Sequence, residues 1–214
     1  MIEVIHYEEK STEEPFVPMI EKSYEEVRGY LTHIPDPVKI YFDDEDRVIP
    51  ELGVGGFALS RDTITLSVQK DFEDKVAQAK NLHGTIFHES FHLAQHYTGA
   101  DGYHPAVNAA IYEGCAEVFE REYTESNSIV GDYSAHSQQE LEAWLEALKE
   151  VGSSYFEEEG VWEKWAFYNE ELKQRWIVYK TGTWLVDRVL KETGLDILDL
   201  QDKSAEEILG LHDF

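Results

Sequence analysis

Apolar residues in the first third of the chain follow two spacings, one typical of strands and one typical of a helix. They alternate at 38–42 and again on both sides of Arg61-Asp62, where glycines precede the first run. Alternation predicts a strand, and two alternating runs around a short polar segment predict a hairpin. Residues 2–7 predict a further short strand. Steps of three and four residues predict a helix through Ile20, Tyr24, Val27 and Leu31.

From Asp71 onward the spacing of apolar residues is helical almost to the end of the chain. Polar segments at 99–104 and 124–137 predict loops. Ser204-Ala-Glu-Glu207 has the form of a capping box and predicts a short final helix. The other predicted helices are 71–81 and 82–98, which meet at Gly84, 105–123, one through Leu141, Leu145 and Leu148, and one long helix from Leu172 to Leu190.

The order of these elements predicts an α+β fold. A small antiparallel or mixed sheet, which includes the hairpin, occupies residues 1–70 and packs on a predominantly helical part, 71–214. A length of 214 residues fits one domain, so we expect residues 1–214 to form a single domain.

The charge of the chain excludes several classes of function. Lys and Arg number 18 and Asp and Glu number 44, which gives a net charge of −26, so the chain repels nucleic acid and anionic membranes.

No apolar run reaches the roughly 18 residues of a membrane span, and the N-terminus does not resemble a signal peptide. Cys115 is the only cysteine, which indicates a reducing compartment. We therefore expect a cytoplasmic protein.

The most informative segment is 84–99, because it contains the H-E-x-x-H motif His88-Glu89-Ser90-Phe91-His92. On a helix, residues i and i+4 share a face, so both imidazoles can bind one Zn²⁺. Glu89 would be the general base that takes a proton from the attacking water and returns it to the leaving amine. A chain of this composition would contain an H-E-x-x-H motif by chance with a probability of roughly 5%. The alternative is a pair of histidines that bind no metal.

Zinc requires a third protein ligand, and the sequence leaves several candidates. His96 lies eight residues beyond His88, about 12 Å along a helix, so one ion cannot join the two. Gln95 and Thr98 stand where metzincins have Gly and His, which excludes that class. A stripe of three glutamates on one helix face either binds metal and orients a ligand histidine or is a solvated acidic face. The candidates are Asp101, His104, Glu113, Glu117 and Glu120, of which the glutamates form the stripe.

The HESFH segment followed by YEGCAEVFE resembles the gluzincin metallopeptidases, the thermolysin-like clan. In the aminopeptidases of that clan, an N-E-G-F-A-E-Y-F-E-like segment follows the H-E-x-x-H helix, and its first Glu is the third zinc ligand. The resemblance implies that Glu113 binds zinc and that Glu117 orients a ligand histidine. Tyr112 replaces the usual Asn, and the twenty residues between His92 and Glu113 slightly exceed the usual spacing.

Tyr179-Lys180-Thr181-Gly182 is similar to the Y-x-K-G element of the same aminopeptidases, with the lysine shifted by one position. There the tyrosine hydroxyl stabilises the oxyanion of the tetrahedral intermediate, so the resemblance implies this role for Tyr179. The alternative is that Tyr179 is a core residue of the long helix.

Roughly residues 50–210 also resemble bacterial proteins described as predicted Zn-dependent proteases. The shared features are an H-E-x-F-H-x-x-Q core from His88 to Gln95, an E-G-x-A-E segment and a glycine-led hairpin. This resemblance implies an α+β fold in which the helical part carries the zinc-binding helix, with Zn²⁺ as the cofactor.

Together these features predict a zinc-dependent metallopeptidase with a peptide or protein substrate. In gluzincins an edge strand beside the zinc helix pairs with extended substrate, so the resemblance implies this role for FALS (57–60) or TITLSV (63–68). The alternative is that these residues form an ordinary sheet edge. Two alternatives remain, an interaction or regulatory module that keeps a structural metal and a zinc hydrolase of a small amide. Glu89 argues against the first, because a structural site has no use for a base.

Overall fold

The computed structural model describes residues 2–5, 16–43, 47–102, 104–126 and 128–211. Contacts divide the chain into two compact units, one of residues 1–101 and 119–127 and the other of residues 102–118 and 128–214. The helix α3, Ala106–Tyr123, belongs to both units. None of the described helices combines the length and the apolar character that a membrane span needs.

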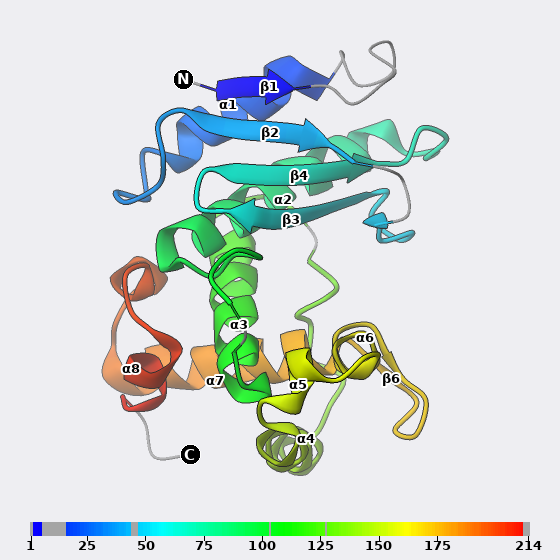
Figure 1. Ribbon diagram of the computed structural model, residues 1–214, viewed down its shortest axis with the longest axis vertical. Coiled ribbons are helices and arrows are strands. Elements are labelled where there is room, and N and C mark those ends of the chain that lie inside the picture. Colours follow the sequence, from blue (N-terminus) through cyan, green and yellow to red (C-terminus); the bar gives the residue numbers. More distant parts are fainter. Residues whose placement is uncertain (1, 6–15, 44–46, 103, 127, 212–214) are drawn as a thin grey trace. The chain divides into compact units, whose positions relative to one another are not determined.

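The first unit is a four-stranded mixed sheet with two helices against one face (Figure 1). Its strands lie in the order β1-β2-β4-β3, in which β2 is parallel to both β1 and β4, and β3 is antiparallel to β4. The helices are α1, Val17–Val27, and α2, Lys75–Gln95. The strands are β1, Ile2–Ile5, β2, Val38–Phe42, β3, Val54–Ser60, and β4, Thr63–Val68.

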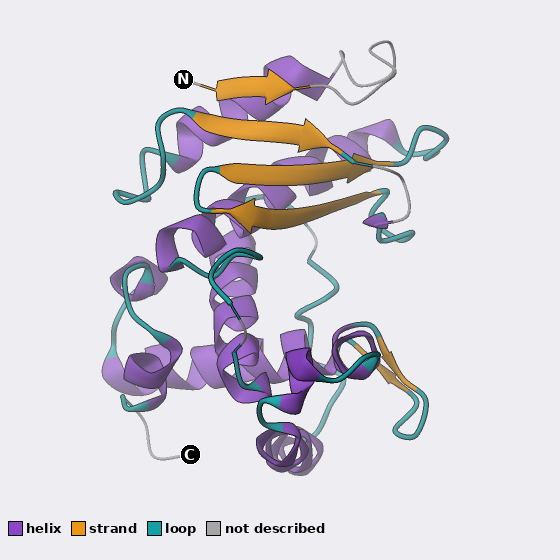
Figure 2. Cartoon of the chain, viewed as in Figure 1, coloured by secondary structure: helices purple, strands orange, loops and turns teal. Residues whose placement is uncertain are grey.

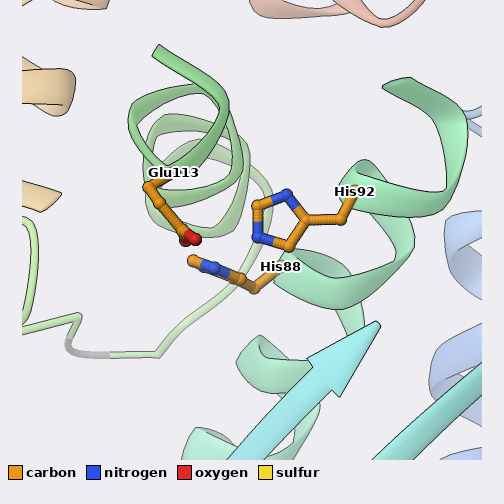
Figure 3. Close-up of side chains that lie close together, drawn as sticks. All are labelled: His88, His92 and Glu113. Atoms are coloured by element: carbon orange, nitrogen blue, oxygen red, sulfur yellow. The ribbon is translucent and has the colours of Figure 1, made fainter. Parts of the chain in front are cut away.

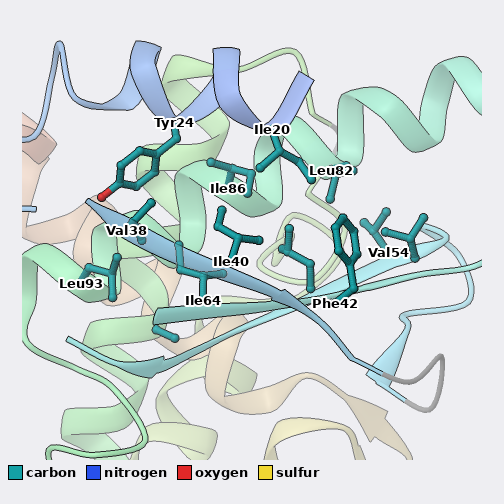
Figure 4. Close-up of a cluster of buried hydrophobic side chains, with 13 residues drawn as sticks. Ile20, Tyr24, Val38, Ile40, Phe42, Val54, Ile64, Leu82, Ile86 and Leu93 are labelled. Atoms are coloured by element: carbon teal, nitrogen blue, oxygen red, sulfur yellow. The ribbon is translucent and has the colours of Figure 1, made fainter. Parts of the chain in front are cut away.

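Alternate residues of the strands form the core of this unit with the apolar faces of α1 and α2 (Figure 4). Val38, Ile40 and Phe42 are almost fully buried, as the alternation in the sequence predicts. Burial of these side chains is the main force that holds α2 against the sheet. The helices contribute Ile20, Tyr24, Leu82, Ile86 and Leu93 to the same cluster.

The second unit is almost entirely helical (Figure 2). Its α3 and α7 cross where two glycines meet, because a Cβ added to Gly182 would lie 1.8 Å from the carbonyl oxygen of Ala110. A Cβ on Gly114 would lie 2.2 Å from the carbonyl carbon of Gly182, so only glycine permits this approach. The other elements are α4, Gln138–Val151, α5, Ser154–Glu157, α6, Val161–Ala166, β5, Tyr168–Asn169, β6, Gln174–Arg175, α7, Ile177–Thr193, a 3₁₀ helix, Ile197–Leu200, and α8, Ala205–Leu209.

The predicted α+β class is confirmed, and so is the capping box at Ser204, whose hydroxyl accepts the backbone N–H of Glu207. Two predicted boundaries are wrong. Residues 71–98 hold one helix rather than two, since α2 continues through Gly84. The long helix begins at Ile177 rather than Leu172, because the β5–β6 hairpin occupies the preceding residues.

Candidate metal centre

The histidine motif lies in the second half of α2, a helix of 21 residues with well-defined ends. The Asp74 side chain caps its first turn by accepting the backbone N–H groups of Val76 and Ala77 at 3.1 and 2.9 Å. The helix ends at His96, whose left-handed backbone (φ 55°) stops it and whose side chain is exposed. His96 is therefore a helix-end residue.

His88 and His92 share one face of α2, as the i, i+4 spacing predicts (Figure 3). Their imidazole centroids are 4.8 Å apart, and their exposed fractions are only 8% and 4%. A buried imidazole must find a hydrogen bond or a metal for its ring nitrogens. Two such rings side by side are a ready pair of nitrogen ligands.

Aromatic side chains hold the last turns of α3 against α2 within the first unit. The ring of Phe119 stacks on Phe87 with centroids 5.4 Å apart and lies 5.0 Å from the ring of Phe91. These two α2 residues immediately precede His88 and His92. The residue after Phe119 is Glu120, so this packing brings the acidic stripe of α3 beside the histidine motif.

Glu120 lies next to the first histidine of the motif. Its Oε2 atom is 3.5 Å from Nδ1 of His88, with both side chains buried, and its Oε1 atom accepts the Ser126 hydroxyl at 2.5 Å. Gly84 makes room for this carboxylate, because a Cβ there would lie 2.4 Å from Oε1. A carboxylate beside Nδ1 favours the proton on that nitrogen and leaves Nε2 free to bind a metal.

Glu117 lies one turn and Glu113 two turns before Glu120 on the same helix, which fixes their spacing from it. Glu117 is buried and accepts the backbone N–H of Gly131 at 3.0 Å and the hydroxyl of Ser128. Glu113 is half-buried and lies near Tyr155, whose pKa is raised chiefly by burial and further by the Glu113 charge.

Two groups of side chains on α2 and α3 could hold a metal ion, and within each group one ligand atom per residue lies within 4.8 Å of the others. One group is His88, His92 and Glu113 (Figure 3), and the other is His88, Glu117 and Glu120. Two imidazoles and one carboxylate are a donor set that suits Zn²⁺, whereas one imidazole and two carboxylates are a harder set. The chemistry of the donors therefore favours the first group for zinc.

The remaining ligand candidates have other partners. The Asp101 carboxylate accepts Arg61 at 2.6 Å and the hydroxyl of Thr98 at 2.6 Å, and these hydrogen bonds lower its pKa against the effect of burial. The His104 ring packs edge-on against Tyr112 with centroids 5.3 Å apart. Neither residue joins a group of possible metal ligands among the described residues.

Glu89 is buried on α2 and lies against the edge strand β3. A Cβ added to Gly56 would lie 2.8 Å from Cγ and Oε1 of Glu89 and 2.5 Å from the methyl group of Thr85. Only glycine at position 56 therefore leaves this space to the Glu89 carboxylate. A glycine inside a strand often marks such a close approach, so the Gly55-Gly56 pair is the signal by which the sequence could have revealed it.

The backbone of Gly56 faces away from the rest of the sheet. Its partner across the strands is Leu66, whose carbonyl accepts the Asp43 N–H at 2.8 Å on the opposite side of β4. The two residues thus form a non-hydrogen-bonded pair, and both backbone groups of Gly56 point to the outer edge of β3.

Neighbouring positions on this outer edge already have partners. Val54 accepts the N–H of Ile49 at 2.9 Å, and Ala58 accepts the N–H of Gly99 at 2.9 Å. Gly56 lies between them. TITLSV (63–68) forms β4, which lies between β2 and β3, so its prediction as a substrate-binding edge is wrong. FALS (57–60) belongs to the edge strand, although the Ala58 carbonyl already accepts the Gly99 N–H.

Tyr179 is half-buried in the first turn of α7, and its carbonyl accepts the Thr183 hydroxyl at 2.8 Å. A Cβ on Gly131 would lie 2.6 Å from both the Thr183 hydroxyl and the Glu117 carboxylate. Tyr179 therefore stands one helical turn from the residues around Glu117, on the helix that crosses α3 at Gly114 and Gly182.

A mixed α+β fold with a histidine pair and glutamates on two packed helices defines a candidate metal-binding protein. A family model described as "Predicted Zn-dependent protease (DUF2268)" matches residues 16–210, nearly the whole chain. The chain belongs to this family. The chain matches none of the curated proteins and none of the solved structures with which it was compared.

Proposed function

We propose that the protein is a zinc metallopeptidase of the gluzincin type, in which His88, His92 and Glu113 bind the ion. The proposal is supported by the pair of buried imidazoles, by the chemistry of this donor set and by the family description. Zinc bound there would supply a Lewis acid that polarises a carbonyl oxygen and lowers the pKa of water. The substrate we propose is a peptide or protein in the cytoplasm.

Glu89 is the general base in this proposal. It follows His88 directly, and its carboxylate is buried on α2 beside Gly56. This placement is the observation that carries the proposal, because a structural metal site needs no base. Glu89 takes the proton of the attacking water and passes it to the nitrogen of the leaving amine.

Three further residues have roles in the proposal. Glu117 orients a ligand histidine, as the resemblance implies, and Glu120 shares this role through its position beside Nδ1 of His88. Tyr179 donates its hydroxyl proton in a hydrogen bond to the carbonyl oxygen as negative charge develops on it.

Gly56 supports a mode of substrate binding. An extended peptide that pairs with its outward N–H and C=O would add a strand to the edge of β3. The peptide would then run past the Glu89 carboxylate, which lies against the same glycine. Backbone pairing of this kind fits a peptide and not a small amide.

Cleavage of a peptide library by the zinc-loaded protein, read by mass spectrometry, tests the proposal. We expect Glu89→Gln to lower kcat by roughly 10²–10⁴-fold, because it removes the base, while the bound zinc is retained. Glu73→Gln, at an exposed glutamate just before α2, is the matched control and keeps full activity. Cleavage that survives Glu89→Gln, or a zinc-loaded wild type that cuts no peptide, contradicts the proposal and favours the interaction module.

A further inference from the structure

Lys180, in the first turn of α7, is a half-buried cation. Its Nζ atom lies 3.3 Å from Nε2 of His136 and 5.9 Å from the centre of the Trp176 ring. Among the described residues, no carboxylate oxygen lies within 4.0 Å of this ammonium. Asp132 acts on it only at longer range and is hydrogen-bonded by the backbone N–H of Ser134.

Two other half-buried lysines have acidic partners, Lys39 with Asp62 at 2.8 Å and Lys164 with Glu171 at 2.9 Å. Burial lowers the pKa of Lys180, Arg175 acts in the same direction, and Asp132 opposes them. A partly desolvated cation without a counter-ion is poised for a negatively charged ligand.

A second cation and two aromatic rings surround this position. The Arg175 guanidinium lies 4.0 Å above the ring of Trp176, which itself precedes α7 in a left-handed conformation (φ 58°). His136 is held by Trp144, with ring centroids 4.7 Å apart. No acidic residue lies in the first turn of α7, and the charges of Asp132 and Glu140 act on His136 without a hydrogen bond to it.

Arg175 and Lys180, with His136 beside them, form a cationic cluster that adjoins residues of the proposed reaction within the second unit. Lys180 follows Tyr179 directly. Thr183 is one turn further along α7, and its hydroxyl and the Glu117 carboxylate both lie against Gly131. A substrate group held by Lys180 would therefore lie beside the proposed oxyanion donor.

We propose that the cationic cluster binds a carboxylate of the peptide substrate and so makes Lys180 a specificity-determining residue. This inference rests on the proposed peptidase function. Two sources supply such a group, an acidic side chain near the cleaved bond and the free carboxyl terminus of the peptide. Arg175 and Lys180 add the positive charge, and the neutral His136 accepts a hydrogen bond from the ammonium and aligns it.

Four peptide pools with the same randomised core, free of acidic residues, test the inference. The pools carry either Glu or Gln at one fixed position and end in either a free or an amidated carboxyl terminus. We expect kcat/KM of the zinc-loaded wild type to favour one carboxylate form over its neutral counterpart by roughly tenfold or more, as for charge-assisted hydrogen bonds. Lys180→Met should bring this ratio close to one, mainly through KM. Lys191→Met, at an exposed lysine on the same helix, should keep it.

The pair of pools that shows the preference identifies the source. A wild type that handles all four pools alike, or a Lys180→Met variant that keeps the preference, overturns the inference. If no pool is cut, the proposed peptidase function fails. Fluorescence anisotropy with labelled pools then compares the affinities of the four pools for the zinc-loaded Glu89→Gln variant. Tighter binding of a carboxylate pool, lost on adding Lys180→Met, then supports the cluster, and equal binding of all pools refutes it.

Discussion

At the scale of single residues, the contact between Gly56 and Glu89 is the most sensitive part of the candidate site. Gly56→Ala would push a methyl group onto both Glu89 and Thr85. We expect stability to fall by roughly 1–3 kcal/mol, as for other overpacked positions, and peptidase activity to fall at least tenfold because the base moves, with zinc content unchanged. Urea unfolding, steady-state kinetics and metal analysis measure the three effects.

The double variant Gly56→Ala/Thr85→Ala separates the two contacts. Removing the Thr85 methyl group relieves one clash but not the one with Glu89. We expect it to recover part of the stability and none of the activity. Full activity in Gly56→Ala would show that the position of Glu89 does not depend on this glycine.

At the scale of secondary-structure elements, the crossing of α3 and α7 holds the second unit together. Gly182→Ala would place a methyl group 1.8 Å from the carbonyl oxygen of Ala110. This clash is with backbone atoms, so it cannot be relieved by a change of side-chain rotamer. The helices must separate, and we expect a loss of roughly 1–3 kcal/mol in the free energy of unfolding, measured in urea. Gly210→Ala, whose Cβ would meet backbone oxygens at 3.3 and 3.4 Å, is the matched control and should change stability little. Equal stability of Gly182→Ala and wild type would contradict the close crossing.

The elements that the sequence predicts well are those whose period is local. Alternation at 38–42 and the helical spacing of 105–123 depend on neighbouring residues, so β2 and α3 appear as expected. Gly84 reads as a break between two helices, yet it lies inside α2 because Glu120 and Ser126, far along the chain, need the space. Leu172 fits the helical period of α7 but lies in the turn of the β5–β6 hairpin, where 43% of its surface is exposed.

At the scale of the whole molecule, the α+β class follows from the order of strands and helices along the chain, and the family match covers 16–210. The sheet order β1-β2-β4-β3 cannot be predicted in this way, because parallel pairing between distant strands leaves no local pattern in the sequence. The candidate site divides in the same way. His88, Glu89 and His92 are visible as one motif, whereas the closeness of the Glu120 carboxylate to His88 and of the Glu89 carboxylate to Gly56 arises only from packing.

The central claim is that the chain binds zinc through His88, His92 and Glu113, and metal content by mass spectrometry tests it most directly. We expect about one zinc per chain in the wild type and in the control Glu73→Gln, and almost none in His92→Ala or Glu113→Gln. Glu117→Gln and Glu120→Gln should keep the metal with roughly 10–100-fold weaker affinity, as expected for residues that orient a ligand. A wild type without zinc after loading would contradict the claim. So would zinc that survives His92→Ala and Glu113→Gln but is lost in Glu117→Gln and Glu120→Gln, because the ion would then belong to the other group of ligands.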